Sequence, residues 1–466
     1  MAEMILVFFL MMAPAIMLRS KSEGLRMALI HRYSVHSPLH SPNLSEVEMI
    51  QQLVEISDRR HSVAIEDALP PNRSYSSSSG CSTNGVRPVV GHDDWIYMVR
   101  VGIGTPRPTY VNLHLDTGGN TVWTQCAPCK QCFPQDSPMY RPSHSRTFHT
   151  LPCSHRLCAG LTCIRNMCFY KLTYVHTYLN MSVEIQTHYF RYGDDTYTKG
   201  ALAADHFALA SNLGGGSETV NGVVFGCSYS SSPDMYPGSR AVGGIIGMGT
   251  GPRSFIRQLG TRAKGRFSYC LVSPHHNGTS HLRFGSDIER IKNAQTTRLL
   301  SDPATLHYPL DLKDLSIDGR LLHLPPNTFA PGPDWSRGCV VDSGSWLTYL
   351  TGTAFDTLVE SLEEHFRKYQ SLVRVEGSEP LRLQLCYKKP RGFAAYPTIG
   401  FHFRGAVFRP KAANMFYIDE GSSKFCLFIK KRSQTLLGAV LQQNYRMVFD
   451  INKHKLTFAE EDCARD

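Results

Sequence analysis

Short runs of alternating apolar and polar residues, typical of β-strands, recur along most of the chain. Residues 95–106 alternate and end in a Gly-Thr-Pro turn, whereas residues 306–319 alternate into an Asp-Gly turn that predicts a hairpin. Residues 445–450 and 455–458 predict a closing pair of strands. A helical stripe is clear in residues 354–368, and we expect it to face the core. The pattern therefore predicts an all-β protein with one substantial helix.

One layout of residues occurs twice. Residues 111–124 form an apolar strand that runs into Asp116, followed by a hydroxyl residue, a glycine and a second strand. Residues 338–350 repeat this order around Asp342, and each copy is followed later by an apolar-apolar-Gly unit. A single Asp-Thr-Gly fits an ordinary turn. Two half-chains built to one plan instead predict a single site that receives one aspartate from each half.

Length, composition and charge narrow the class of protein. A chain of 466 residues is long enough for two domains with separate cores. Its 37 Gly and 27 Pro residues suit a turn-rich β protein. The formal net charge is +10, but the basic residues are scattered singly, so nucleic-acid binding is not expected. A basic surface facing anionic polysaccharide is the milder alternative.

The N-terminal residues predict export from the cell. Residues 4–12 form an apolar run followed by the small residues Ala13 and Ala15, which indicates a signal peptide over residues 1–20. This run is too short to cross a bilayer comfortably, and no other long apolar run follows, so no membrane span is expected. The expected destination is extracellular, with the vacuole as the alternative. Among the Asn-x-Ser/Thr sites, Asn180 and Asn277 are the predicted glycosylation sites.

The cysteines indicate the redox compartment. Seven of the 14 cysteines lie between Cys126 and Cys168. The spacing Cys126-x-x-Cys129-x-x-Cys132 suggests zinc as one interpretation, but no second cysteine or histidine pair follows at zinc-finger distance. Disulfides formed in an oxidising compartment are the favoured interpretation. We therefore expect no metal and no cofactor.

Taken together, the two aspartate motifs resemble those of the pepsin-like aspartic proteases. The resemblance is to the plant nepenthesin-like branch in particular, because residues 123–132, Trp-Thr-Gln-Cys-Ala-Pro-Cys-Lys-Gln-Cys, directly follow the first motif. It extends over essentially the whole chain, through residues 225–227, 244–249, 267–270 and 442–450.

The resemblance implies an all-β, bilobal fold with two pseudo-symmetric lobes and a cleft between them. A pro-segment over residues 21–90 would follow the signal peptide and act as an intramolecular inhibitor. The N-terminal lobe would span residues 91–285, with a Cys-rich insertion and a flap, and the C-terminal lobe residues 286–466. A monomer that acts on peptide or protein substrates is expected.

The chemistry implied by the resemblance rests on Asp116 and Asp342. Two carboxylates a few Å apart raise each other's proton affinity, so one stays protonated while the other ionises and activates a water that attacks a peptide carbonyl. This pattern is carried over from pepsin itself. Thr117 and Ser343 would tie the two loops together beneath the aspartates. Gly118 and Gly344 would let backbone N–H groups approach the carboxylates.

One position of the implied site departs from the family pattern. The third residue after each aspartate normally supplies a hydroxyl, as Ser345 does in the second copy, but Gly119 stands there in the first. Losing one hydrogen bond to a charged group costs about 1.5–3 kcal/mol if nothing replaces it.

The flap is the second departure. In the family, Trp123 would hold the flap tyrosine by a hydrogen bond. Residues 175–192 form an apparent insertion, so either Tyr174 or Tyr192 fits that role, and Tyr192 is favoured because it precedes Gly193 at the turn. The turn reads Gly-Asp-Asp-Thr where the family has Gly-Asp-Gly-Ser.

The resemblance also implies a disulfide pattern. The implied pairs are Cys126 with Cys129, Cys132 with Cys227, Cys153 with Cys168, Cys158 with Cys163, Cys270 with Cys463, and Cys386 with Cys426. Spacing alone does not choose among the many possible pairings. Cys81 would leave with the pro-segment, and Cys339 would remain as a free, buried thiol.

Two functions compete on this sequence. The leading hypothesis is a secreted aspartic endopeptidase made as a zymogen. The alternative is a catalytically impaired binding protein on the same scaffold, either an inhibitor of cell-wall-degrading enzymes or a storage-type protein, because fold alone does not decide function. Both aspartates favour the enzyme, whereas Gly119 and the altered flap favour the alternative. A metal-binding or redox protein is a distant third.

Overall fold

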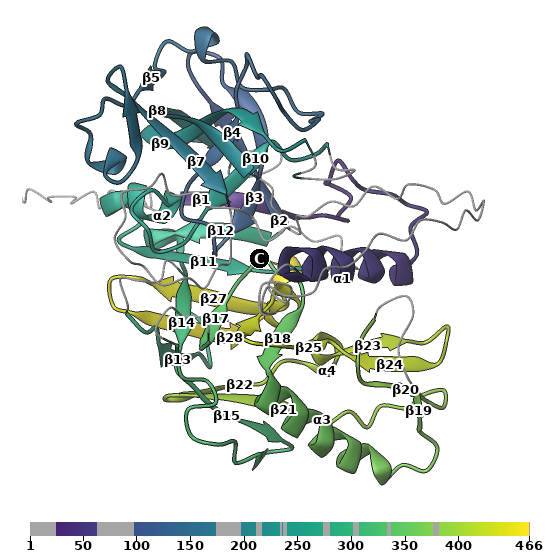
Figure 1. Ribbon diagram of the computed structural model, residues 1–466. Helices are drawn as coiled ribbons and strands as arrows, with labels where there is room; N and C mark the ends of the chain where they lie inside the picture. The colour runs from purple at the N-terminus through teal and green to yellow at the C-terminus, as the bar shows by residue number, and fades with distance from the viewer. Residues whose placement is uncertain are drawn as a thin grey trace, which may run out of the picture.

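The computed structural model describes most of the chain, and all structural statements below refer to that part. It comprises residues 25–62, 97–173, 197–210, 217–233, 235, 240–273, 280–301, 307–332, 337–375 and 382–465. The chain forms two β lobes that are stacked in Figure 1, one in blue and teal, the other in green and yellow. The predicted bilobal, all-β fold is therefore confirmed.

The strands of the first lobe belong to one large sheet. Its strand order runs β2-β3-β10-β4-β9-β8-β7-β6, with β5 beside β8. These strands are β2 (Tyr97–Ile103), β3 (Thr109–Asp116), β4 (Trp123–Gln125), β5 (His149–Thr150), β6 (Thr162–Ile164), β7 (Met167–Thr173), β8 (Tyr197–Ala210), β9 (Ser217–Ser231) and β10 (Gly244–Gly247). A short helix, α2 (Phe255–Gln258), follows β10.

The same sheet continues into strands from the C-terminal part of the chain, so it connects the two lobes. Its remaining order is β13-β28-β27-β11-β12-β1. Here β12 (Ser280–Phe284) pairs with β11 (Arg266–Cys270), and β11 pairs with β27 (Tyr445–Asp450). Strand β27 in turn pairs with β28 (Lys455–Glu460), and β28 pairs with β13 (Gln295–Arg298). The predicted closing strand pair is confirmed as β27 and β28.

The second lobe consists of three smaller sheets with one long helix. Its strands are β14 (Tyr308–Leu310), β15 (Leu312–Ile317), β16 (Arg320–Leu321), β17 (Cys339–Val341), β18 (Thr348–Thr351), β19 (Val373–Val375), β20 (Cys386–Lys388), β21 (Ile399–Phe403), β22 (Ala406–Phe408), β23 (Phe416–Asp419), β24 (Lys424–Leu427), β25 (Ile429–Arg432) and β26 (Thr435–Leu437). Its helices are α3 (Gly352–Arg367), α4 (Ala412–Met415) and α5 (Ala439–Gln442).

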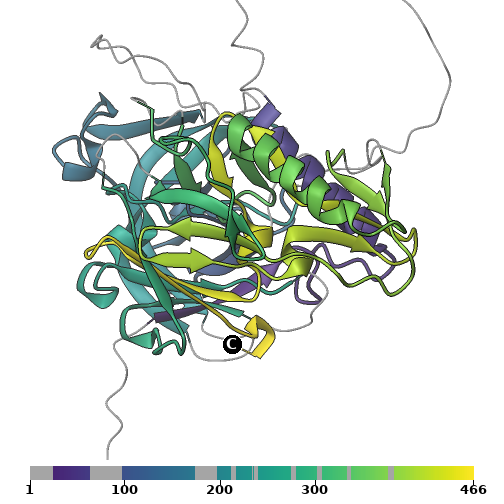
Figure 2. The same cartoon turned by 90° about the horizontal axis from the view of Figure 1, so that it is seen from below.

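Two local predictions in the second lobe are confirmed. The helix α3 buries Phe355, Leu358 and Phe366 and packs on β15, β18 and β25. Figure 2 shows it in green beside the strands of this lobe. The predicted hairpin turns at Asp318 and Gly319, whose φ angles of 48° and 82° lie in the left-handed region that Asp-Gly turns adopt.

The segment predicted as a pro-segment enters the core of the molecule. Strand β1 (Leu25–His31) lies between β12 and β2, with Leu25 opposite Phe284 and His31 opposite Tyr97. Helix α1 (Glu46–Ser62) lies at the junction of the two lobes in Figure 1. The sequence had indicated only a polar, removable or flexible stretch for residues after 34. Residues 35–62 are instead part of the fold.

Helix α1 has a clear start and a clear buried face. At its N-terminus, Ser45 Oγ accepts a hydrogen bond from Glu48 N–H (3.3 Å), while Ser45 N–H donates to the Glu48 carboxylate (2.9 Å). This reciprocal capping box satisfies donors that a helix end leaves open. Hydrogen bonds from Ser45 lower the pKa of Glu48. The buried face includes Ile50, Leu53 and Ile56, so helix formation and docking onto the lobes are coupled.

Four of the implied disulfides are wrong. The structure pairs Cys126 with Cys227, Cys129 with Cys132, Cys153 with Cys163 and Cys158 with Cys168, in place of Cys126–Cys129, Cys132–Cys227, Cys153–Cys168 and Cys158–Cys163. The structure also contains Cys270–Cys463 and Cys386–Cys426, which the resemblance had implied. Among the described cysteines, Cys339 is free and buried, and burial raises the pKa of its thiol.

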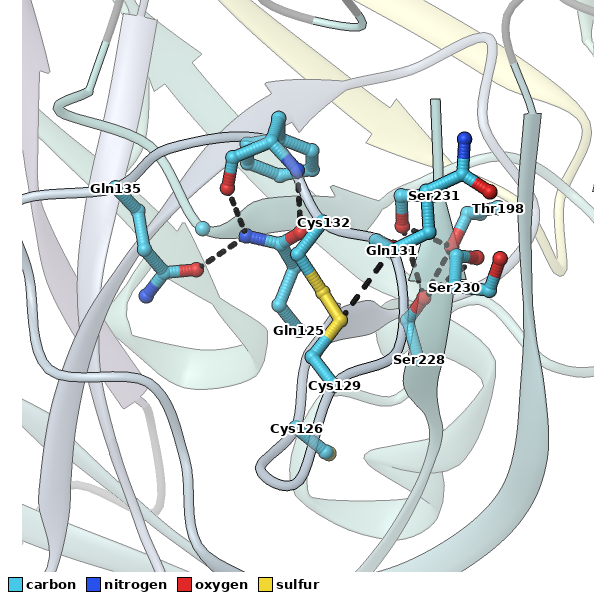
Figure 3. Close-up of a disulfide and its surroundings, with 12 residues drawn as sticks. Gln125, Cys126, Cys129, Gln131, Cys132, Gln135, Thr198, Ser228, Ser230 and Ser231 are labelled. Carbon is cyan, nitrogen blue, oxygen red and sulfur yellow. Dashed lines mark hydrogen bonds between the residues drawn. A yellow bond between two sulfur atoms is a disulfide. The ribbon is translucent and has the colours of Figure 1, made fainter. Parts of the chain in front are cut away.

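Strand register explains the pairing of Cys126. Strand β4 runs parallel to β9 with Thr124 opposite Cys227, and the backbone of Cys126 donates to Ser228 O (2.7 Å). Cys126 therefore lies 5.4 Å from Cys227 between Cα atoms, within the normal range for a disulfide. Cys132 lies farther along the loop, where it closes a four-residue ring with Cys129 (Figure 3).

Burial of the cysteines explains the other two corrected disulfides. Cys163 and Cys168 face each other across the β6–β7 hairpin, but Cys163 is exposed whereas Cys168 is fully buried. Buried Cys168 pairs with buried Cys158, and exposed Cys163 pairs with half-buried Cys153. Neither strand register nor burial could be read from cysteine spacing.

Candidate active site

The fold brings Asp116 and Asp342 to equivalent places in the two lobes. Asp116 ends β3, which runs parallel to β10 so that Gly247 lies opposite it. Asp342 directly follows β17, which runs parallel to β26. Met248 N–H donates to Asp116 O (2.8 Å), and Asp342 N–H donates to Leu437 O (3.1 Å). Each apolar-apolar-Gly unit of the sequence is thus the strand that holds one aspartate in place.

A glycine is required in both of these supporting strands. A methyl group built on Gly247 would lie 2.7 Å from Thr121 N, and one built on Gly438, just after β26, would lie 2.1 Å from Leu347 O. Both distances are too short for any side chain, so only glycine lets each aspartate loop pass against its supporting strand.

The two carboxylates face each other across the junction of the lobes. A methyl group built on Gly118 would lie 3.2 Å from Asp116 Oδ1 and 3.5 Å from Asp342 Oδ1, so these two oxygens are no more than about 7 Å apart. Asp116 is 1% exposed and Asp342 is 9% exposed. Backbone N–H groups stabilise both carboxylates, from Gly118 to Asp116 (2.8 Å) and from Gly344 to Asp342 (2.9 Å).

Threonine and serine side chains link the two loops below the carboxylates. Ser343 N–H donates to Thr117 Oγ1 (2.9 Å), and Thr117 N–H donates to Ser343 Oγ (3.3 Å). Thr117 Oγ1 also lies 3.4 Å from Asp342 Oδ1, and Ser343 Oγ donates to Leu115 O (3.4 Å). All of these groups are buried, so the links fix the separation of the two aspartates.

The third position after each aspartate differs between the loops. Ser345 Oγ–H donates to Asp342 Oδ2 (2.7 Å). Gly119 has no hydroxyl, and a methyl group built there would lie 2.9 Å from Asp116 Oδ2. A serine at 119 would therefore reach the carboxylate only if Asp116 moved by a few tenths of an ångström.

Two further residues support Asp342 that the sequence did not single out. Gln442 donates through Nε2 to Asp342 O (3.3 Å) and accepts from Tyr269 Oη (2.5 Å). Burial and the nearby Asp342 charge raise the pKa of Tyr269 well above its usual value, so the phenol remains a donor. Both residues lie in segments of the resemblance, but no spacing rule connects them with Asp342.

Part of the predicted flap can be placed. Trp123 is fully buried, and its ring packs edge-on against Phe133 with centroids 6.3 Å apart. Tyr192, Gly193 and the glycosylation sites Asn180 and Asn277 lie outside the described residues. The predicted partnership of Trp123 with a flap tyrosine therefore stays a prediction, as do the two glycosylation sites.

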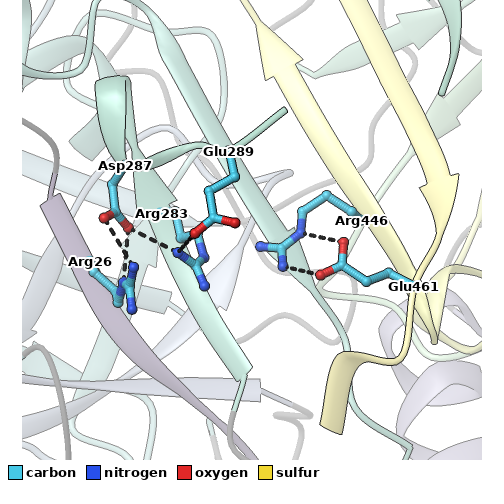
Figure 4. A network of polar contacts seen from close by, with 6 residues as sticks. All are labelled: Arg26, Arg283, Asp287, Glu289, Arg446 and Glu461. Atoms are coloured by element: carbon cyan, nitrogen blue, oxygen red, sulfur yellow. Dashed lines mark hydrogen bonds and ion pairs between the residues drawn. The ribbon is translucent and has the colours of Figure 1, made fainter. Parts of the chain in front are cut away.

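The N-terminal segment directly contacts the loop that carries Asp342. Leu347 N–H donates to Ser57 Oγ of α1 (2.8 Å), and both residues are fully buried. His31 of β1 lies beside Trp346, with ring centroids 6.2 Å apart. At the other end of β1, Arg26 makes a bidentate ion pair with Asp287, which also contacts Arg283 (Figure 4).

Comparison with known proteins shows which proteins the chain resembles. Residues 97–286 match a family model described as xylanase inhibitor N-terminal, and residues 307–460 match one described as xylanase inhibitor C-terminal. Aspartic proteinase nepenthesin-2 of Nepenthes gracilis is 29% identical over 432 residues, or 91% of this chain and 87% of its own. Aspartyl protease 37 of Oryza sativa subsp. japonica is 29% identical over 463 residues, or 92% of each chain.

The chain belongs to the plant pepsin-like aspartic proteases. Solved structures show the same fold at lower identity. That of edgp superposes with a TM-score of 0.60 at 17% identity, covering 80% of this chain and 93% of that one. Basic 7S globulin from soybean superposes with a TM-score of 0.57 at 19% identity, covering 79% and 94%. These two likenesses establish the architecture alone.

Two further features of the described residues concern metal ions and membranes. No group of three or more His, Cys, Asp or Glu side chains there is arranged to hold a metal ion. The helices of that part of the chain are too short or too polar to cross a bilayer.

Proposed function

We propose that this protein is an aspartic endopeptidase made as a zymogen and secreted, with the vacuole as the alternative destination. The observation that carries the proposal is the pair of buried carboxylates, Asp116 and Asp342, held within about 7 Å of each other by mirrored hydrogen bonds. The named aspartic proteases among its relatives support a peptide substrate. We expect the protein to act as a monomer, without a cofactor.

The reaction follows from the shared charge of the pair. With both groups buried at this separation, ionisation of one carboxyl disfavours ionisation of the other, so one proton remains between them. The ionised carboxylate takes a proton from a water molecule as that water attacks the peptide carbonyl, and the protonated one donates to the carbonyl oxygen. The N–H group of Gly118 favours the ionised form of Asp116, and that of Gly344 favours the ionised form of Asp342.

Residues 25–62 are proposed to belong to an inhibitory pro-segment. Three contacts support this role: β1 occupies a place in the shared sheet, Arg26 pairs with Asp287, and Ser57 accepts from Leu347 N–H beside the second catalytic loop. Removal of β1 would leave the edges of β12 and β2 without their partner strand. Cleavage between this segment and β2 would then release the active form.

Acidification of the full-length proprotein tests this function. The expected result is self-processing that pepstatin inhibits and that Asp116→Ala abolishes. The matched control is Asp356→Ala, because Asp356 is exposed on α3 and only pairs with Lys431. Control protein that processes as the wild type does, beside a stable Asp116→Ala chain, supports the protease. A wild-type chain that remains intact and cleaves no peptide from pH 2 to 6 contradicts it.

One observation favours a second function, a binding protein on the same scaffold. Gly119 removes a hydroxyl from the Asp116 loop, whereas the Asp342 loop keeps Ser345. The matched family models carry the description of a xylanase inhibitor, which makes a cell-wall-degrading glycosidase the candidate partner. Nanomolar inhibition of a xylanase by protein that shows no peptidase activity would establish this alternative.

A further inference from the structure

A histidine of the second lobe lies beside the aspartate pair. His307 immediately precedes β14, which is antiparallel to β17 with Tyr308 opposite Val341. The next position in that register brings His307 opposite Asp342. Its side chain is half-buried. The backbone alone therefore places an ionisable ring at the level of the second catalytic aspartate.

Tyr308, the next residue, holds His307 in place through a contact with the first lobe. Its hydroxyl donates to Met248 O (2.5 Å), and Met248 N–H in turn donates to Asp116 O (2.8 Å). Tyr308 is fully buried, and burial raises the pKa of its phenol above the usual value, so it remains neutral and a donor. His307 is thus anchored between the two catalytic loops.

The ring of His307 and the two carboxylates surround one point. A methyl group built on Gly118 would lie 3.5 Å from His307 Nδ1, 3.2 Å from Asp116 Oδ1 and 3.5 Å from Asp342 Oδ1. His307 Nδ1 is therefore within about 7 Å of Asp116 Oδ1 and of Asp342 Oδ1. Among the described residues, the charged groups near it include these two carboxylates, and the guanidinium of Arg257 on α2 acts on the neighbouring Tyr308.

We propose that His307 is a positioning residue that sets the acid limit of the aspartate pair. The inference rests on the proposed peptidase function. Histidine side chains are protonated in the acidic range in which such a pair works. A cation at this distance favours the singly ionised pair over the doubly protonated one. The pair therefore keeps its one negative charge, and its activity, at a lower pH than it would beside a neutral residue.

Coulomb's law gives the size of the effect. For unit charges about 7 Å apart, the acid limb should lie lower by about 0.4 pH units in a water-like environment and by about 1.7 pH units at an effective dielectric constant of about 20. Because His307 is half-buried, we expect a value between these limits.

The first test is the pH profile of kcat/KM for peptide cleavage by acid-processed protein. His307→Gln should move the acid limb upward by at least about 0.4 pH units. His307→Lys, which restores a cation, should return the limb toward that of the wild type. His144→Gln, at an exposed histidine, is the matched control and should leave the profile unchanged. Equal acid limbs in wild type and His307→Gln would overturn the proposal.

The second test needs no activity. In full-length protein labelled at histidine, NMR follows the titration of the His307 ring, assigned by its loss in His307→Gln. The double variant Asp116→Asn/Asp342→Asn removes the one negative charge that the pair holds and should lower the midpoint of that titration by at least about 0.4 pH units. An unchanged midpoint in the double variant overturns the inference. Shifted midpoints in a protein that cleaves no peptide support this coupling but contradict the proposed function.

Discussion

The two aspartate loops, which carry Asp116 and Asp342, are built to one plan but are not equally supported. Both hold their aspartate on a parallel strand, offer it a backbone N–H and share the Thr117–Ser343 links. The Asp342 loop has in addition the Ser345 hydroxyl and the Gln442 amide. It is also the loop that α1 contacts through Ser57. The comparison shows that the two loops differ in the side chains that support each aspartate.

The largest expected effect tests what the loops have in common. Asp116→Asn and Asp342→Asn should each lower kcat/KM by about 100-fold to 10,000-fold, because a pair with one amide can no longer exchange its proton with water. Peptide cleavage by acid-processed protein is the measurement. A variant that keeps more than a tenth of wild-type activity would show that its loop is not catalytic.

The next effect tests the difference between the loops. Ser345→Gly makes the second loop resemble the first and removes a buried hydrogen bond to a charged group, worth about 1.5–3 kcal/mol. We expect kcat/KM to fall by about 10-fold to 150-fold. Ser422→Gly, which removes an exposed hydroxyl that donates a hydrogen bond to the Asp419 carboxylate, is the control. Equal activity of Ser345→Gly and wild type would mean that the hydroxyl plays no part in the reaction.

A smaller effect concerns the contact of α1 with the second loop. Ser57→Ala leaves the buried Leu347 N–H without its acceptor, at a cost of about 1–3 kcal/mol. The docked N-terminal segment should loosen, and acid self-processing, followed by gel electrophoresis, should become several-fold faster. Ser45→Ala is a useful comparison because it weakens the α1 cap without touching the loop. If only Ser45→Ala accelerates processing, helix stability rather than the loop contact restrains the segment.

The smallest expected effect tests whether the first loop can be completed. Gly119→Ser should raise turnover by a few-fold at most, because the new side chain starts 2.9 Å from Asp116 Oδ2 and gains its hydrogen bond only after the carboxylate shifts. Gly119→Ala adds the same bulk without a hydroxyl and should lower turnover. A decrease in both variants would show that the loop has adapted to glycine.

The sequence was sufficient for those features that repeat or alternate. Duplication of the Asp-hydroxyl-Gly layout located the two equivalent aspartate loops, and helical periodicity located α3. Features that depend on strand register were not accessible. Cys126 joins Cys227 because β4 lies beside β9, and His307 approaches Asp342 because β14 lies beside β17. No local pattern encodes either contact.

The docked N-terminal segment was missed for a related reason. Its polar composition indicated a removable or flexible stretch, but a few apolar residues, including Ile50 and Leu53, are enough to bury one face of α1. Strand β1 forms most of its hydrogen bonds with β12, more than 240 residues away in sequence. Composition gives the average polarity of such a segment, whereas docking depends on the apolar residues of one helix face.

Pepstatin binding to acid-processed protein, measured by calorimetry at pH 3, tests the central claim most directly. Asp116 and Asp342 acting as one pair predict one bound inhibitor per wild-type chain and a loss of affinity of at least about 100-fold in both Asp116→Asn and Asp342→Asn. Equal binding by wild type and either variant, or no binding by folded wild-type protein, would contradict the account.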